Sequence, residues 1–276
     1  MQVIQKIFSG FVLLLSFSIL HAQTDSVMYQ RDSAVIPETD PTVLFFQQNE
    51  KAASPAVVKL ITKANKIISL QAFLVISGIY ADHVLADLDK DGKKELLISN
   101  YTGGAHCCDE IYIFKNIAPN RYQHVVKFNA GNTSVNRNNE FGFNFYQHFG
   151  YFFTCYACAY TDTTDEAPIE LHNILVKYNK GKVVVVPGGK ELRNAIIDNL
   201  GKLGEQPYEK LESDIDQDNG LRKEFAINLA VFYYSFGRNL TETQKLFNKY
   251  YKYPDAKKIW AAFVKQLQSI RKDNDF

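Results

Sequence analysis

The chain of 276 residues carries almost no excess charge, with 31 Lys and Arg against 30 Asp and Glu. Lys6 is the only charged residue among the first 22, so the rest of the chain holds 30 basic and 30 acidic residues and has no formal net charge. Proteins that bind nucleic acid or an anionic membrane electrostatically carry a basic excess. The sequence therefore gives no reason to expect nucleic acid as a partner.

Long apolar segments are also scarce, and the main one is residues 7–20. This run follows Lys6 and ends just before Ala22 and a polar stretch, the pattern of a secretory signal peptide. It is too short to cross a bilayer core of about 30 Å. A bacterial lipoprotein would have a cysteine at the end of this run, and there is none. We expect residues 1–22 to be a signal peptide, an uncleaved anchor being the alternative. The mature protein would then be periplasmic or secreted, with no membrane insertion.

Motifs that mark common catalytic sites are missing too. The sequence contains no Gly-x-Ser-x-Gly, His-Glu-x-x-His or Walker loop, and no repeat with a period of about 20 to 50 residues. Side chains able to act as acids or bases are present, but none stands in a pattern that fixes nucleophile, base and orienting group together. These candidates are His106, His148, His172, Glu140, Asp162 and Asp165.

Aromatic residues, in contrast, are abundant, with 20 Phe and 16 Tyr. Their flat rings suit a β-rich core. Apolar and polar residues alternate over much of residues 67–187, which predicts strands with one buried face. The alternation is clearest in residues 141–145 and 151–159, and the break at residues 147–150 predicts a hairpin turn between them.

Other local patterns complete this part of the chain. Residues 174–186 predict a second hairpin, which turns at residues 179–181. Ser54-Pro55 indicate the start of a short helix, with Leu60 and Ile61 on its apolar face. Residues 23–40 are polar and lack a period, so we expect a flexible tail there.

After residue 187 the apolar period becomes helical. Three stretches have apolar residues every three or four positions, and each predicts an amphipathic helix. The sets are Leu192, Ile196, Leu200 and Leu203; Leu221, Phe225, Leu229, Phe232 and Phe236; and Ile259, Phe263, Leu267 and Ile270. Thr241 and Gln244 fit a capping box for a helix between the last two sets. The chain is thus predicted to have an α+β fold, with an antiparallel β-rich domain at residues 41–187 and a helical domain at residues 188–276.

An acidic run within the β-rich part has the spacing of a calcium loop. Asp87, Asp89, Asp91 and Glu95 occupy positions 1, 3, 5 and 9, Gly92 allows a sharp turn at position 6, and the residue at position 7 can offer its backbone carbonyl. Ca²⁺ binds six to eight oxygen ligands in flexible geometry. Position 12 lacks an acid and both flanks are strand-like, so the loop is not an EF-hand. A solvated acidic turn without metal is the alternative.

The surrounding stretch, ISGIYADHVLADLDKDGKKELLISNYTGGAHCCDEIYIFKN, resembles a single FG-GAP or VCBS-type repeat, the calcium-binding blade unit of integrin-type β-propellers. The resemblance covers about residues 79–116 and rests on the Asp-x-Asp-x-Asp-Gly-x-x-Glu loop and the strands on both sides. It implies Ca²⁺ as the cofactor, bound by Asp87, Asp89, Asp91, the Lys93 carbonyl and Glu95. Only one copy is present, so a propeller is not implied for the whole chain.

The four cysteines allow three interpretations. Zinc binding would need the adjacent residues Cys107 and Cys108 to bind one tetrahedral ion, which adjacent cysteines rarely do well. Redox chemistry would need Cys155-x-x-Cys158 at the start of a helix, but Cys155 lies in a strand-like pattern. Cysteines of an exported protein most often form disulfides. Neighbours on an extended chain point to opposite faces, so we favour two cross-links between the segments. The sequence does not choose between the two cross-pairings, and a bond between Cys107 and Cys108 remains an alternative.

These observations lead to two functional hypotheses. The first is an exported, calcium-binding, disulfide-stabilised structural or interaction module, whose helical part would offer a surface for a protein partner. The second is an extracytoplasmic enzyme, a hydrolase. A deep pocket in which two of the candidate acid–base groups converge would favour the enzyme.

Overall fold

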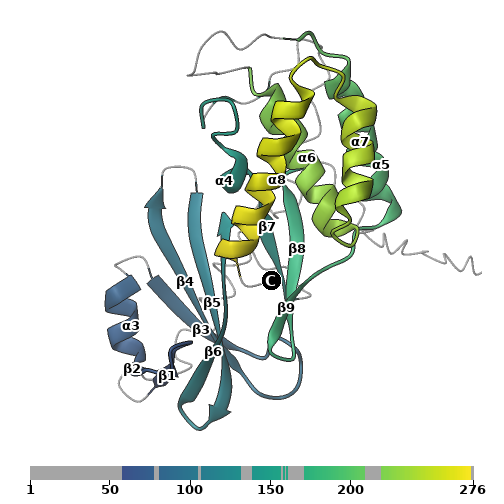
Figure 1. The fold of residues 1–276 in the computed structure, drawn as a ribbon. Helices are drawn as coiled ribbons and strands as arrows, with labels where there is room; N and C mark the ends of the chain where they lie inside the picture. Colours follow the sequence, from purple (N-terminus) through teal and green to yellow (C-terminus); the bar gives the residue numbers. More distant parts are fainter. Residues whose placement is uncertain are drawn as a thin grey trace, which may run out of the picture.

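The computed structural model has an α+β fold, which confirms the predicted fold class (Figure 1). Two sheets and two short helices make up the N-terminal half, and four longer helices make up the C-terminal part. The structure describes residues 58–77, 81–104, 107–131, 139–156, 158, 160, 171–208 and 219–274. The expected signal peptide and flexible tail, residues 1–22 and 23–40, lie outside these ranges.

The larger sheet is a mixed, six-stranded half-barrel with the strand order β2-β1-β6-β5-β4-β3. Its strands are β1 (Lys59–Ile61), β2 (Ile67–Ser69), β3 (Ala81–Ala86), β4 (Glu95–Gly104), β5 (Cys107–Ala118) and β6 (Arg121–Gly131). Neighbouring strands are antiparallel except β1 and β6, which are parallel. The helix predicted from Ser54-Pro55 is wrong at Leu60 and Ile61, because their backbone pairs with β6.

Both faces of the larger sheet are covered. On one face, Leu97 of β4 and Ile113 of β5 belong to the main hydrophobic cluster of the protein. On the other face, Leu96 and Phe114 belong to a smaller cluster, which lies against the helix α3 (Leu70–Ser77). Successive residues of a strand point to opposite faces, so adjacent apolar residues in β4 supply both clusters.

The smaller sheet consists of β7 (Glu140–Asn144), β8 (Asn173–Asn179) and β9 (Lys182–Val185), all antiparallel. The predicted hairpin over residues 174–186 is confirmed. Lys180 and Gly181 form its turn with positive φ angles of 47° and 84°, as a two-residue hairpin loop of type I′ requires.

The second strand predicted after β7 is wrong, and so is the hairpin turn at residues 147–150. The chain forms the short helix α4 (Tyr146–Phe149) and then a series of turns and bends through Thr154. The Phe149 amide donates to the Phe145 carbonyl, and the Phe152 amide donates to the Phe149 carbonyl. These turns bury Phe149 and Phe152. The aromatic residues of this segment therefore reach the core from tight turns, although their spacing also suits a strand.

The C-terminal helices are α5 (Lys190–Gly204), α6 (Leu221–Ser235), α7 (Leu240–Tyr250) and α8 (Ala256–Asp273). The apolar residues predicted for α5 and α8 are buried, which confirms these two amphipathic helices. Helix α7 begins after Asn239, whose side chain accepts a hydrogen bond from the Glu242 amide at 3.1 Å. The cap is therefore Asn239 and not Thr241.

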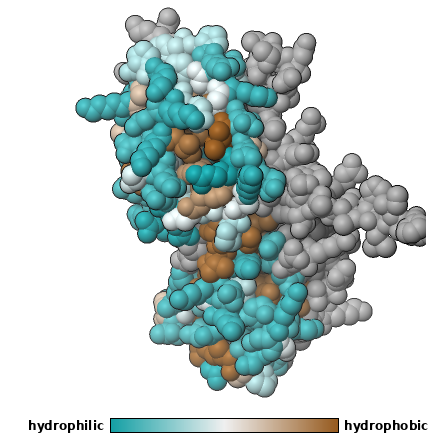
Figure 2. Space-filling view, turned by 90° about the vertical axis from the view of Figure 1, so that its right-hand side faces the viewer, coloured by the Kyte–Doolittle hydropathy of each residue, from teal (hydrophilic) through white to brown (hydrophobic). Residues whose placement is uncertain are grey.

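Helix α6 lies at the centre of the helical part, and every one of its residues is buried. It contacts α4, α5, α7, α8 and β8. The main hydrophobic cluster contains residues from both sheets and from α5 to α8, so the two sequence regions share one core. None of the described helices is long and apolar enough to cross a membrane. Figure 2 shows one face of the molecule, where hydrophilic residues interrupt the apolar patches.

Candidate functional site

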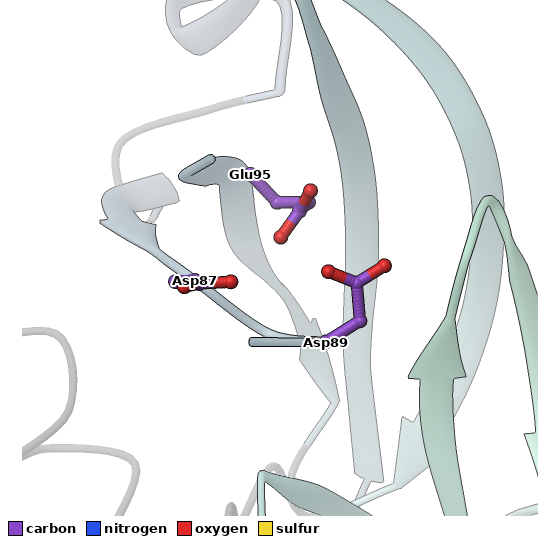
Figure 3. Close-up of side chains that lie close together, drawn as sticks. All are labelled: Asp87, Asp89 and Glu95. Carbon is purple, nitrogen blue, oxygen red and sulfur yellow. The ribbon is translucent and has the colours of Figure 1, made fainter. Parts of the chain in front are cut away.

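The acidic loop joins β3 to β4, as its strand-like flanks predict. Ala86 and Glu95 are the strand pair next to the loop, so Asp87 begins the loop and Glu95 ends it. Carboxylate oxygens of Asp87, Asp89 and Glu95 lie within 4.8 Å of one another (Figure 3). This partly buried group of two aspartates and one glutamate could hold a metal ion.

The carboxylate of Asp87 organises the loop. Its Oδ1 accepts a hydrogen bond from the Asp91 amide and its Oδ2 accepts one from the Gly92 amide, both at 3.0 Å. Lys90 and Gly92 have positive φ angles of 60° and 86°, which turn the chain sharply enough for these contacts. The acidic spacing thus has a local structural role as well as any role in ion binding.

Two other predicted ligands lie at the outer side of the loop. Asp91 is exposed, and its Oδ1 accepts a hydrogen bond from the Lys93 amide at 2.8 Å. The structure does not place Asp91 in the group of three converging carboxylates. The predicted contribution of the Lys93 carbonyl remains a prediction.

Electrostatics at the loop are unfavourable for a cluster of bare carboxylates. Glu95 is only 3% exposed, and its Oε2 accepts a hydrogen bond from the Leu88 amide at 3.0 Å. Burial and, to a smaller extent, the negative charges of Asp89 and Asp91 together raise the pKa of Glu95 to about 7, although the hydrogen bond from Leu88 opposes the shift. The Oδ1 atom of Asp89 is buried and has no hydrogen-bond partner within the described residues. A bound cation would satisfy this oxygen and offset the repulsion.

Two residues far away in the sequence complete the loop, and sequence patterns did not reveal them. The Lys180 amide, in the β8–β9 turn, donates to Asp89 Oδ2 at 3.0 Å. The Asn139 side chain, just before β7, donates to the backbone carbonyls of Asp87 and Leu88 at 3.2 and 3.4 Å. Both belong to segments that lead into the smaller sheet, so the acidic loop joins the two sheets.

The cysteine pairing differs from the prediction. Cys155 and Cys158 are bonded to each other, with their Cα atoms 5.1 Å apart, so the predicted cross-links to Cys107 and Cys108 are wrong for this pair. The cause is local: the chain turns here, and the Cys158 amide donates to the Cys155 carbonyl at 3.2 Å. The side chains of Cys107 and Cys108 are not among the described ones.

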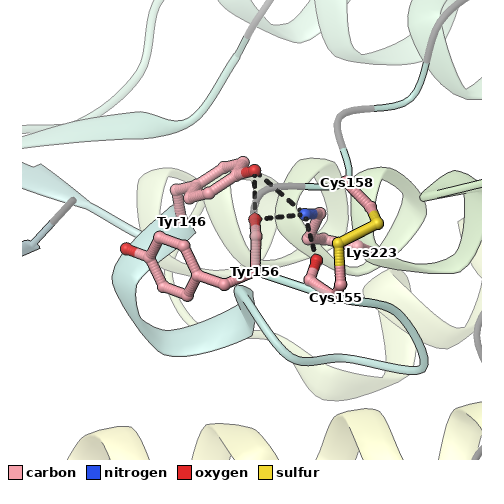
Figure 4. Close-up of a disulfide and its surroundings, with 5 residues drawn as sticks. All are labelled: Tyr146, Cys155, Tyr156, Cys158 and Lys223. Carbon is pink, nitrogen blue, oxygen red and sulfur yellow. Dashed lines mark hydrogen bonds between the residues drawn. A yellow bond between two sulfur atoms is a disulfide. The ribbon is translucent and has the colours of Figure 1, made fainter. Parts of the chain in front are cut away.

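The first turn of α6 carries three consecutive charged residues, all buried, each with a different partner. Arg222 forms an ion pair with Asp255 at 2.8 Å. Glu224 contacts the Nε2 atom of His172 at 3.0 Å. Lys223 donates to the hydroxyl of Tyr146 and to backbone carbonyls of the Cys155–Cys158 loop (Figure 4). The apolar stripe predicted for this helix was correct, but it gave no sign that these charges are buried too.

Of the candidate acid–base groups in the described part of the chain, His172 is engaged in a buried pair, and none lines either of two surface hollows. His172 pairs with Glu224, and both are less than 8% exposed. Two surface hollows, of about 530 and 340 Å³, are lined by neither His172, His148 nor Glu140. His106, Asp162 and Asp165 lie outside the described residues.

Comparisons with known proteins add no relative. No family model matches the chain, and neither the curated proteins nor the solved structures contain a match. The likeness to an FG-GAP or VCBS-type repeat therefore depends on the acidic loop and its flanking strands alone.

Proposed function

We propose that the protein is an exported, calcium-binding, disulfide-stabilised module with a structural or interaction role. This proposal rests on the convergence of Asp87, Asp89 and Glu95 at one turn, and on the buried Oδ1 atom of Asp89, which has no hydrogen-bond partner among the described residues. Carboxylates that are buried side by side repel one another unless a cation or a proton neutralises them. A cation bound between the three would remove this penalty.

The types of ligand favour calcium over other common ions. All three converging side chains offer oxygen, whereas zinc prefers nitrogen and sulfur ligands. The exposed carboxylate of Asp91 and the carbonyl of Lys93 would bring the number of oxygens closer to the six to eight that Ca²⁺ takes. Mg²⁺ needs a smaller and stricter octahedron and usually keeps several waters, so a loop that offers this many protein oxygens favours Ca²⁺.

Calcium binding would act on the fold rather than on a substrate. Asp89 receives a hydrogen bond from the β8–β9 turn, and Asp87 lies at the segment that Asn139 holds. An ion that fixes the three carboxylates would therefore fix the contact between the two sheets. The exposed faces of the helical part would remain available to a protein partner.

The calcium proposal is tested by thermal melting in chelator and in millimolar Ca²⁺. Extracellular calcium modules bind at about 10⁻⁴ to 10⁻³ M, so the expected gain is on the order of 1 kcal/mol, or about 2–4 °C in melting temperature. Mg²⁺ should have a smaller effect. Asp89→Asn should remove most of the response, and Asp198→Asn, at an exposed position on α5, should keep it. Equal calcium shifts in wild type and Asp89→Asn, or no shift in either, would overturn the proposal.

The proposed export has a separate test. Protein isolated from its native host should begin at or near Gln23, because a signal peptidase would cut after Ala22. N-terminal sequencing or intact mass measures this directly. Detection of Met1 on the accumulated protein would contradict export by signal cleavage and would leave the calcium experiment unaffected.

A further inference from the structure

The loop closed by the disulfide between Cys155 and Cys158 lies beside a buried cation. Lys223 is 1% exposed, and its Nζ atom lies 3.3 Å from the Cys155 carbonyl and 3.1 Å from the Tyr156 carbonyl. The same ammonium lies 2.9 Å from the Tyr146 hydroxyl and over the Tyr146 ring. Figure 4 shows Lys223 between the two tyrosines and the disulfide. Both cysteines are partly exposed, so a reagent in solution can reach the bond.

We propose that Cys155 and Cys158 form a reversible dithiol–disulfide couple, with Lys223 stabilising the reduced form and a thiol-bearing polypeptide as the reaction partner. This activity would be independent of calcium binding. The loop would then bind a partner and transfer electrons, in addition to its role as a structural cross-link.

The charge of Lys223 favours the reduced form of the cysteine pair. Reduction produces thiols, and a thiolate is stabilised by a nearby positive charge, which lowers the thiol pKa. Lys223 supplies that charge from a fixed position, because two loop carbonyls and a hydroxyl hold its ammonium. Stabilising the reduced form makes a disulfide a stronger oxidant.

The start of α6 adds to this effect. A Cβ atom on Gly220 would come within 3.1 Å of the Cys158 carbonyl, so Cys158 lies against the residue that precedes α6. The N-terminal end of a helix carries a partial positive charge, and cysteines at such ends have lowered pKa values. Here the CxxC loop meets the start of a neighbouring helix instead of beginning its own helix.

The disulfide closes a very short loop and so contributes little to the stability of the fold. A disulfide stabilises a fold mainly by restricting the unfolded chain, and this effect falls as the loop becomes shorter. Cys155 and Cys158 are only three positions apart, so the loop that they close is among the shortest that a disulfide can form, and its stabilising effect is small. The segment just before the loop is already anchored by Phe149 and Phe152 in the main hydrophobic cluster. Opening this disulfide should therefore leave the fold intact, as reversible chemistry requires.

Tyr151 connects the CxxC loop to a surface hollow in which the partner could lie. The ring of Tyr151 packs against that of Tyr156, which stands between the two cysteines, with centroids 5.3 Å apart. Tyr151 is 78% exposed and lines the hollow of about 530 Å³ together with Phe153 and Lys258. A polypeptide lying in this hollow would carry its thiol past the CxxC loop.

The exchange is balanced in atoms and electrons. A thiolate of the partner attacks one sulfur of the disulfide, the S–S bond breaks, and a mixed disulfide forms while the other sulfur leaves as a thiolate. A second partner thiol, after losing its proton, attacks the partner sulfur of this mixed disulfide and releases the second cysteine. Two electrons and two protons pass from the partner dithiol to Cys155 and Cys158, and the partner gains a disulfide.

The test equilibrates the full chain in glutathione redox buffers, then alkylates the free thiols and maps the peptides by mass. This reads the Cys155–Cys158 peptide separately from the one that contains Cys107 and Cys108, and near-ultraviolet circular dichroism reports whether the fold persists. We expect reversible reduction with the fold retained. We also expect the reduced pair to react with iodoacetamide with an apparent pKa below the ordinary thiol value of about 8.5.

Charge-removing variants assign the role of the cation. Lys223→Met should make the disulfide about tenfold harder to reduce by glutathione and should return the thiol pKa toward about 8.5. Lys245→Met, which removes an exposed cation on α7 outside the proposed site, should leave both values unchanged. If Lys223→Met does not fold, the thiol pKa of the wild type decides alone. Reduction only together with unfolding, an ordinary thiol pKa in the wild type, or unchanged behaviour of a folded Lys223→Met would each overturn the proposal.

Discussion

The backbone amide of Lys180 donates a hydrogen bond to Asp89 Oδ2 at 3.0 Å, although the two residues are 91 positions apart in the chain. Lys180 lies in the turn between β8 and β9, and Asp89 lies in the loop between β3 and β4. The bond therefore links the half-barrel to the smaller sheet. Any ion that holds the Asp89 carboxylate in place will also affect the β8–β9 hairpin.

Calcium should slow hydrogen exchange at the Lys180 amide. If the ion stabilises the loop by on the order of 1 kcal/mol, protection at this amide should rise about fivefold. The amide of Asn120, in the β5–β6 turn, is the matched control and should not change. Exchange measured by NMR or mass spectrometry in chelator and in Ca²⁺ checks this. Equal changes at both turns would mean that the ion acts on the whole protein and not through Asp89.

Glu95→Gln should stabilise the metal-free protein. The substitution removes a buried charge whose pKa is raised to about 7, and the amide oxygen can still accept the hydrogen bond from Leu88. We expect a gain of about 1 kcal/mol in the free energy of unfolding at pH 8 in chelator, and loss of the calcium response.

Glu110→Gln is the contrasting control for that experiment. Burial alone would raise the pKa of Glu110, but hydrogen bonds from Lys127 and Tyr112 lower it. The charge is therefore stabilising there, and its removal should cost about 1 kcal/mol. Urea unfolding of both variants measures the two effects. If Glu95→Gln lost as much stability as Glu110→Gln, the charge of Glu95 would not be destabilising in the metal-free loop.

Much of the fold could be predicted because its segments obey local rules. The stripes of α5 and α8 have a period that only a helix can bury on one side, and the turn at Lys180 and Gly181 uses a residue that tolerates positive φ. Residues 151–159 misled the prediction, because aromatic side chains can also reach the core from consecutive tight turns. The pairing of Leu60 with β6 depends on a distant strand, which no local pattern records.

The local part of the candidate site could also be predicted from the sequence, and its long-range part could not. Asp87, Asp89 and Glu95 are close in sequence, and their spacing is itself the signal. Asn139 and Lys180 contribute through contacts over long sequence distances, and neither residue type suggests a role in ion binding. The burial of Lys223 was hidden for a different reason, since a lysine beside an arginine and a glutamate normally marks an exposed helix face.

The identity of the residue that caps α7, Asn239 or Thr241, can be tested by substitution. Asn239→Ala removes the side chain that accepts from the Glu242 amide, and loss of such a cap typically costs about 1 kcal/mol. Thr241→Ala, at the position that the sequence pattern favoured, should cost less than about 0.5 kcal/mol. Chemical denaturation of the two variants separates the alternatives, and the reverse order of the two losses would restore Thr241 as the cap.

Acid should weaken the fold through His148. Its ring stacks on Phe143 of β7 with centroids 5.2 Å apart, and its Nε2 atom is buried without a hydrogen-bond partner within the described residues. Burial lowers the pKa of His148 to about 4, although the Asn129 carbonyl of β6 and the charge of Asp273 in α8 oppose the shift. An unfolded chain would protonate this ring near its ordinary value of about 6.5.

The sign of the effect follows from these two values. Above pH 6.5 the ring is neutral in both states and costs nothing, whereas between about 6.5 and 4 only the unfolded state takes up the proton. Stability is therefore lost as the pH falls through this window, by on the order of 1 kcal/mol between pH 7 and pH 5. Glu95, with its raised pKa, acts in the opposite direction in the metal-free protein, so the wild-type slope alone does not isolate His148. Urea unfolding of wild type and His148→Gln across this range does so, because the variant should lose less stability on acidification. Parallel pH profiles would show that the His148 ring takes up its proton at the same pH in the folded and unfolded states.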